Sequence, residues 1–162
     1  MISSHSTIKS LCLSAVVAAL YAALTLAFQA ISFGAVQLRV AEALTLLPAM
    51  FPQAVPGLVL GCLISNLLGG MGVYDVVFGT LATLIAAVLT WRIRGNLWLK
   101  ALPPVLVNAV VIGLMLTYAY GVNTPVLNIL TVGLGQAISC YALGVPLVKL
   151  LQKHDLGKRL GC

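Results

Sequence analysis

Charged side chains are scarce in this chain of 162 residues, and acidic ones are scarcest. Nine Lys or Arg and three Asp or Glu make up 7% of the sequence, whereas an ordinary soluble domain carries about 25% charged residues. Apolar residues make up 61%, which leaves too little polar surface for a soluble fold of this size. The composition therefore excludes an ordinary soluble domain and predicts a polytopic membrane protein.

Motifs for catalysis, nucleotide hydrolysis and metal binding are also lacking. There is no Walker A, HExxH or GxSxG pattern. The basic residues form no stripe with interleaved aromatics, which argues against nucleic-acid binding. We expect no enzyme activity, no catalytic residue, no cofactor and no metal site. The four cysteines have no CxxC or zinc-site spacing; they are Cys12, Cys62, Cys140 and Cys162.

Long apolar stretches recur along the whole chain. Because a helix needs about 20 apolar residues to cross a bilayer, the sequence predicts an all-α integral membrane protein with six spans in a single domain, residues 1–162. The second and third spans are short, and short Gly- or Pro-interrupted segments often line a cavity. The segment 92–100 is predicted to be a polar loop. The predicted spans are 11–31, 40–51, 57–68, 74–91, 101–120 and 126–151.

The basic residues indicate the orientation in the membrane. All except Arg39 fall in the N-terminal tail, the 92–100 loop or the C-terminal tail. The positive-inside rule places these segments in the cytoplasm, so both termini are predicted to be cytoplasmic. The loops at 32–40, 69–74 and 121–125 are then external, and polar residues gather toward them. The candidate substrate-binding residues are Arg39, Glu42, Asn66, Tyr74, Asp75, Phe78, Tyr118 and Asn128.

Two carboxylates near the ends of apolar segments stand out among these candidates. Arg39 and Glu42 are three residues apart, so they can meet on one helix face, either as a substrate contact or gate or as an ion pair that anchors the helix end. Asp75 lies in a first helical turn, where it can offset the helix dipole or bind a ligand. With Phe78 and Gly79 on the same face, its two oxygens suit parallel N–H donors such as a guanine edge.

Small residues recur every four positions in the first span. Ala15, Ala19 and Ala23 lie on one helix face, where a second helix can approach closely. Ala18 and Ala22 offer a second register, which could serve packing within the chain. The amides Asn108 and Gln136, nearer the middle of their spans, are predicted to form interhelical hydrogen bonds.

Taken together, these segments resemble the substrate-binding S component of energy-coupling factor (ECF) transporters, and within them the queuosine-precursor transporter (QueT) family. The resemblance covers essentially the whole chain. Its most specific carriers are Phe33-Gly34-Ala35-Val36-Gln37-Leu38-Arg39-Val40-Ala41-Glu42-Ala43-Leu44 and Tyr74-Asp75-Val76-Val77-Phe78-Gly79-Thr80-Leu81-Ala82-Thr83, beside the less specific pattern of Ala15, Ala19 and Ala23.

The resemblance implies a six-helix bundle in a prokaryotic plasma membrane, with an external pocket covered by the first loop. The substrate would be a 7-deazaguanine precursor of queuosine, or queuine. The face with Ala15, Ala19 and Ala23 would dock on a transmembrane coupling subunit that carries two cytoplasmic ATPases, so that ATP hydrolysis belongs to the partners. Two other hypotheses stay open from the residues alone: a stand-alone secondary carrier for a small organic solute, and a structural membrane subunit without a ligand.

Overall fold

The computed structural model describes residues 4–32, 38–70 and 72–155, and every regular element within these ranges is a helix. Eight segments are α-helical, η1 is a 3-10 helix, and η2 and η3 are π-helical turns. In chain order they are α1 (Ser4–Ala27), α2 (Gln29–Ser32), η1 (Val40–Ala49), α3 (Ala54–Leu68), η2 (Asp75–Gly79), α4 (Thr80–Arg92), α5 (Leu97–Lys100), α6 (Leu102–Tyr118), α7 (Pro125–Ala137), η3 (Ile138–Gly144) and α8 (Val145–Lys153).

Four helical stretches are long and apolar enough to cross a membrane, which confirms an all-helical membrane protein. They are Thr7–Ala27, Asp75–Arg92, Leu97–Tyr118 and Pro125–Lys153. The predicted second and third spans correspond to shorter apolar helices, Val40–Ala49 and Ala54–Leu68. At about 1.5 Å per residue, the fifteen residues of α3 cover less than the roughly 30 Å of a hydrocarbon core.

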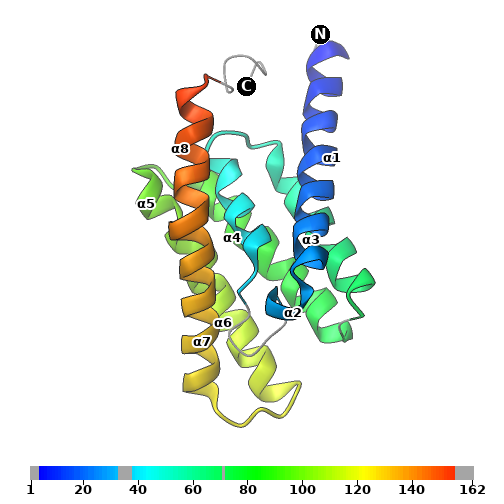
Figure 1. The fold of residues 1–162 in the computed structure, drawn as a ribbon, viewed down its shortest axis with the longest axis vertical. Coiled ribbons are helices and arrows are strands. Elements are labelled where there is room, and N and C mark those ends of the chain that lie inside the picture. Colours follow the sequence, from blue (N-terminus) through cyan, green and yellow to red (C-terminus); the bar gives the residue numbers. More distant parts are fainter. Residues whose placement is uncertain (1–3, 33–37, 71, 156–162) are drawn as a thin grey trace.

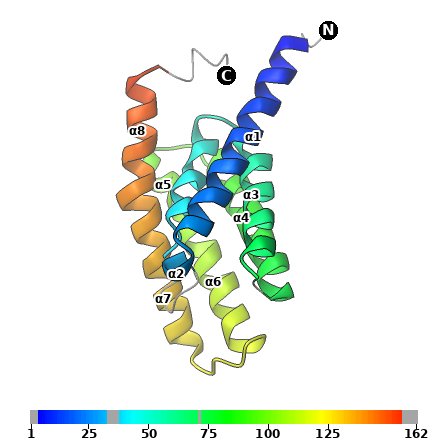
Figure 2. The ribbon, with the colours of Figure 1, turned by 45° about the vertical axis from the view of Figure 1, so that its right-hand side comes forward.

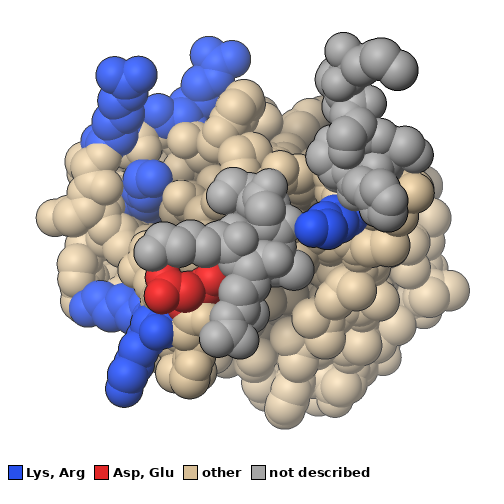
Figure 3. Space-filling view, turned by 90° about the horizontal axis from the view of Figure 1, so that it is seen from above, with Lys and Arg blue, Asp and Glu red and all other residues tan. Residues whose placement is uncertain are grey.

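The chain runs back and forth between two ends of an elongated bundle (Figures 1 and 2). One end carries the N-terminal part of α1, the turn between η1 and α3, and the C-terminal part of α8. The opposite end carries α2, the end of α3 and the connection between α6 and α7. Seen from above, Lys and Arg side chains gather on the end with the termini, called the basic end below (Figure 3).

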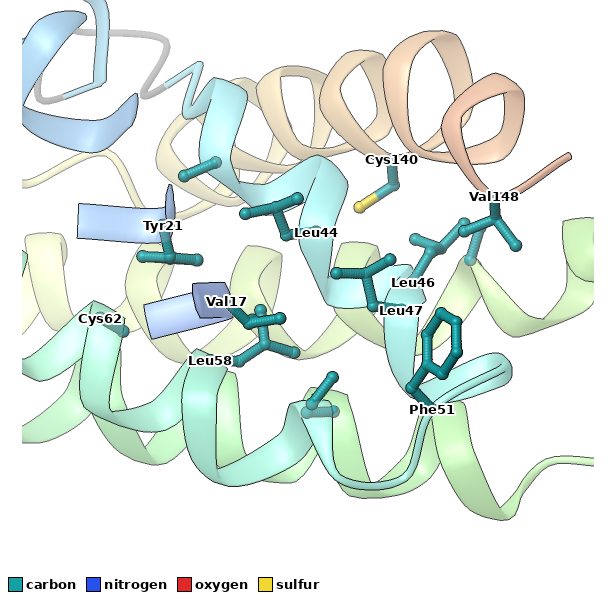
Figure 4. Packing of buried hydrophobic residues seen from close by; sticks show 14 of the residues in the cluster. Val17, Tyr21, Leu44, Leu46, Leu47, Phe51, Leu58, Cys62, Cys140 and Val148 are labelled. Carbon is teal, nitrogen blue, oxygen red and sulfur yellow. The ribbon is translucent and has the colours of Figure 1, made fainter. Parts of the chain in front are cut away.

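The short helix η1 runs through the centre of the bundle. Eight of its ten residues are buried, and it packs against α1, α3, α4, α8 and η3. Leu44, Leu46 and Leu47 of η1 join the core with Val17 of α1 and Leu58 of α3 (Figure 4). Because this core surrounds η1, polar side chains on η1 lie inside the molecule rather than at its surface.

Helices α1 and α3 cross in close contact at two glycines. A Cβ added to Gly57 would lie 2.4 Å from the Ser14 carbonyl oxygen, and one added to Gly61 would lie 2.8 Å from that of Ala18. Any larger side chain there would push the two backbones apart. The crossing therefore fixes which face of α1 points inward.

Several predicted boundaries need correction. The first helix ends at Ala27 rather than at residue 31, and the chain resumes as the separate α2. The predicted loop 92–100 is helical over Leu97–Lys100, because the Asn96 side chain accepts a hydrogen bond from the Leu99 amide at 2.9 Å and caps α5. The fifth span is Leu97–Tyr118 instead of 101–120.

Candidate functional site

Three ionisable side chains lie buried together near the end opposite the basic end. Arg39 directly precedes η1, Glu42 lies in the first turn of η1, and Asp75 opens η2. Their exposed fractions are 6%, 1% and 5%. Charged groups are rarely buried so completely in a membrane bundle unless they have partners or a function.

Glu42 is held from two other helices. The Tyr21 hydroxyl of α1 donates a hydrogen bond to Glu42 Oε1, and Gln136 Nε2 of α7 donates to Oε2 at 2.9 Å. The Glu42 backbone carbonyl accepts from Thr45 Oγ1 at 2.6 Å. These bonds connect α1, η1 and α7 at a single carboxylate, so Gln136 does form the interhelical hydrogen bond that its position predicted.

Asp75 is held by a cation, a phenol and an amide. Arg39 Nη2 lies 3.9 Å from Asp75 Oδ1, within ion-pair range. The Tyr120 hydroxyl donates to Oδ2, and Asn66 Nδ2 donates to the Asp75 backbone oxygen at 3.0 Å. Tyr120 belongs to the α6–α7 connection, and its hydrogen bond to the Asp75 carboxylate raises its pKa to about 12. The phenol therefore keeps its proton across the physiological range.

Arg39 also closes the base of the first loop. Its Nε donates to the Ser32 backbone oxygen at 3.4 Å, which ties the end of α2 to the start of η1. The sequence left two interpretations of Arg39 and Glu42 open, a substrate contact or gate and an ion pair that anchors the helix end. In the structure Arg39 lies within ion-pair distance of Asp75, and Glu42 accepts hydrogen bonds from Tyr21 and Gln136. Residues 33–37, which include part of the segment that carries the family resemblance, lie outside the described residues.

The space beside Gly79 is occupied by Asn66. A Cβ on Gly79 would lie 2.9 Å from Asn66 Nδ2, so the gap that the sequence suggested beneath Asp75 is filled by this amide. The thiol of Cys62 lies against the same group, 3.5 Å from Asn66 Nδ2, and accepts from Thr83 Oγ1 at 3.3 Å. Asn66 thus packs the start of η2 against α3.

The aromatic candidates surround a separate apolar cavity of about 450 Å³ between η2 and α6. Tyr74 and Phe78 stack with ring centroids 6.5 Å apart, and Tyr118 lies across the cavity on α6. Phe78 is 41% exposed and points outward, away from the buried face that Asp75 shares with Gly79. Tyr74 also meets the edge of Tyr120 at 6.0 Å, so the cavity adjoins the group that donates to Asp75.

Asn128 belongs to a different network. Its Nδ2 donates to Thr117 Oγ1 at 3.0 Å and to the Val122 backbone oxygen at 2.9 Å. Thr124 Oγ1 donates to Asn128 Oδ1 at 3.3 Å. These bonds fix the connection between α6 and α7, and among the described residues no hydrogen bond joins Asn128 to Glu42 or Asp75. Of the eight candidates, four form the buried group, which we call the polar cluster: Arg39, Glu42, Asn66 and Asp75.

The two alanine registers of α1 have opposite environments. Ala18 and Ala22 are buried, and Ala18 lies against Gly61 of α3. Ala15, Ala19 and Ala23 are exposed on the other side of α1. The face proposed to dock on a partner is therefore the one left uncovered in the described chain.

Sequence reasoning did not place Tyr21, Tyr120 or Gln136 in the site. Tyr21 is the one aromatic residue in an Ala-rich stretch, and it is fully buried. The sequence predicts only an interhelical hydrogen bond for Gln136, and Tyr120 is not among the candidates. The sequence signal available for Tyr21 is its position two residues from both Ala19 and Ala23, because residues two positions apart point to opposite sides of a helix.

A protein-family search matches the model described as QueT transporter over residues 11–153. The chain belongs to the QueT transporter family. This QueT protein is thus a membrane transporter for a small substrate rather than an enzyme, and its apolar helices embed it in the bilayer. Searches of curated proteins and of solved structures found no match. Within the described residues, no three His, Cys, Asp or Glu side chains come together as a metal site.

Proposed function

We propose that this QueT protein is the substrate-binding subunit of an ECF-type ABC importer in a prokaryotic plasma membrane. It captures a 7-deazaguanine, such as a queuosine precursor or queuine, from outside the cell. The observation that carries this proposal is the polar cluster, two buried carboxylates and a guanidinium. Arg39 bonds the end of α2, which lies away from the termini and the basic end (Figure 1). The positive-inside rule assigns the basic end to the cytoplasm, so the cluster faces the exterior.

The chemistry of the cluster suits a guanine-like edge. Each carboxylate oxygen can accept two hydrogen bonds, and the contacts that the structure gives Asp75 and Glu42 use one at each oxygen. Both acids therefore keep capacity for ring N–H and amino donors. The neighbouring cavity of about 450 Å³, lined by Tyr74 and Phe78, has a size and apolar lining typical of small-molecule sites.

The exposed alanine face supports the second half of the proposal. Ala15, Ala19 and Ala23 present small side chains over three turns of α1, and such a face lets a partner helix approach closely. In this proposal the partner is a transmembrane coupling subunit with two cytoplasmic ATPases, which supply the energy for uptake.

Ligand binding by the purified chain tests the assignment. Asp75→Ala and Glu42→Ala should each weaken binding of a 7-deazaguanine by about 2–5 kcal/mol, because a desolvated polar ligand loses a charged partner. Titration calorimetry in detergent measures this, with mass spectrometry of co-purifying small molecules to identify the ligand. Asp155→Ala, an exposed acid in the C-terminal tail, is the control. Near-wild-type affinity in both cluster variants would refute the site.

One observation favours a second candidate, a stand-alone carrier. Glu42 is a buried carboxylate between a phenol and an amide, and such a group could cycle a proton during transport. Uptake into proteoliposomes by this chain alone, driven by a proton gradient, would select that function. Uptake that needs the coupling subunit and ATP supports the importer.

A further inference from the structure

Basic residues outnumber acidic ones outside the polar cluster. Eight of the nine Lys and Arg residues lie outside it, whereas only one of the three acids, Asp155, does so. Three membrane-spanning stretches begin or end toward the basic end, and each carries a cation there: Arg92, Lys100 and Lys153. Because the ends of membrane spans lie among the lipid headgroups, these side chains come close to lipid phosphate groups.

An aromatic stack with a cation over it joins α5 to the last helices of the chain. Trp98 of α5 stacks on Tyr141 of η3, with ring centroids 5.6 Å and planes 18° apart. Lys149 Nζ of α8 lies 5.6 Å from the centroid of the Trp98 ring, within the range of a cation–π contact. The ring thus restrains the Lys149 ammonium, which lowers the conformational entropy that this side chain would lose on binding an anion.

The Lys149 ammonium keeps its capacity for hydrogen bonds. It carries three N–H donors, and within the ranges that the structure describes it has neither an ion pair with an acid nor a hydrogen bond. Lys153 follows one turn later on the same face of α8, and both lysines are exposed. Two neighbouring ammonium groups, one of them restrained by a ring, therefore suit a single phosphate group.

Exposed apolar side chains adjoin these cations. Leu99 follows Trp98 in α5, and Leu150 follows Lys149 in α8; both leucines are exposed. Cations beside leucines and a tryptophan form an amphipathic surface, which matches the headgroup and the chains of a phospholipid. The N-terminal half of α1 lies on the other side of the bundle from α5 and α8 (Figures 1 and 2). A coupling subunit docked on α1 would therefore leave this surface to lipid.

We propose that Lys149, Lys153 and Trp98 form a binding site for an anionic phospholipid in the leaflet at the basic end. The two lysines bind the phosphate, and the acyl chains run along the exposed leucines. A zwitterionic lipid such as phosphatidylcholine brings its own ammonium group, so it gains less from the two cations. This inference goes beyond the proposed function and holds whatever solute the protein carries.

Fluorescence of Trp98 tests this inference on the full chain. Trp91→Phe leaves Trp98 as the only tryptophan, and brominated acyl chains quench an indole that they touch. The purified protein is reconstituted in phosphatidylcholine vesicles with rising, matched fractions of either dibrominated phosphatidylglycerol or dibrominated phosphatidylcholine. Quenching should give an association constant at least about tenfold higher for the anionic lipid.

Two lysine variants and two controls, all made with Trp91→Phe, assign this preference to the site. Lys149→Gln and Lys153→Gln should each lower it about fivefold, and Lys153→Gln leaves the aromatic stack unaltered. Lys149→Arg keeps the charge and should stay within about twofold of the parent. Lys9→Gln removes an exposed cation from α1, on the other side of the bundle, and should also stay within about twofold.

Each contrary outcome overturns a stated part of the inference. Equal association constants for the two brominated lipids would overturn the lipid site altogether. A preference that falls as far in Lys9→Gln as in the two site variants would reflect overall positive charge, and would overturn a defined site. An unchanged preference in Lys149→Gln or Lys153→Gln would contradict phosphate binding by that lysine. Loss of the preference in Lys149→Arg would contradict recognition through charge.

Discussion

The two faces of α1 are built from the same small residue and have opposite environments. On one face, Ala18 and Ala22 pack inward with Tyr21, whose hydroxyl reaches Glu42. On the other, Ala15, Ala19 and Ala23 are exposed. The difference shows that alanine serves two purposes here. Inside, it lets α3 come close; outside, it leaves small side chains exposed on the face that we propose as the docking surface.

The largest effect on folding stability is expected for Ala18→Trp. A Cβ added to Gly61 would already lie 2.8 Å from the Ala18 carbonyl oxygen, so an indole has no room between α1 and α3. Overpacking of this kind should lower the free energy of unfolding by about 3 kcal/mol or more, measured as a drop in thermal midpoint in detergent. A midpoint like that of the wild type would mean that α1 does not pack on α3 through this face.

Tyr21→Phe should have a smaller effect on the inner face. It removes the hydroxyl that donates to Glu42 and keeps the ring in the core. Hydrogen bonds to charged groups contribute about 1.5–3 kcal/mol, and the unfolding free energy should fall by that amount. Tyr118→Phe is the matched control, because Tyr118 is 82% exposed. Equal changes in the two variants would contradict the Tyr21–Glu42 contact.

Ala19→Trp should have the smallest effect on stability, although it is the same substitution one residue along. On the exposed face the indole meets lipid or detergent, so stability should change by no more than about 0.5 kcal/mol and ligand binding should stay intact. Uptake and assembly with the coupling subunit should be lost, as measured by co-purification and transport assays. Normal assembly of this variant would contradict the docking role of the exposed alanine face. Loss of ligand binding would indicate a role in folding.

The helices could largely be predicted from the sequence because apolar length alone determines them. Long stretches such as those around Leu11 and Val126 fall within helices of the structure. The alanine register could not be predicted, because both registers repeat every four residues; Gly57 and Gly61, far along the chain, decide between them.

The polar cluster could be predicted only in part. The two acids could be identified as candidates because charged residues are rare in this chain. Asp75 lies close to Arg39 and Asn66, two other residues of the candidate list. The hydrogen-bond partners of Glu42 could not be predicted, since Tyr21 and Gln136 lie 21 and 94 residues away in sequence. The orientation of Phe78 was also missed, because the helical repeat assumed for it was that of an α-helix, whereas Asp75–Gly79 is a π turn.

Because Asp75 begins this π turn, the direction of its carboxylate depends on the number of residues in the turn. Its wider i→i+5 bonding adds one residue to the helical turn that directly precedes α4. Removing one residue would leave a regular α-helix but rotate Asp75 by about 100° about the helix axis, carrying its carboxylate away from Arg39 and Tyr120. A single-residue deletion here could thus abolish recognition while every side chain of the cluster remains.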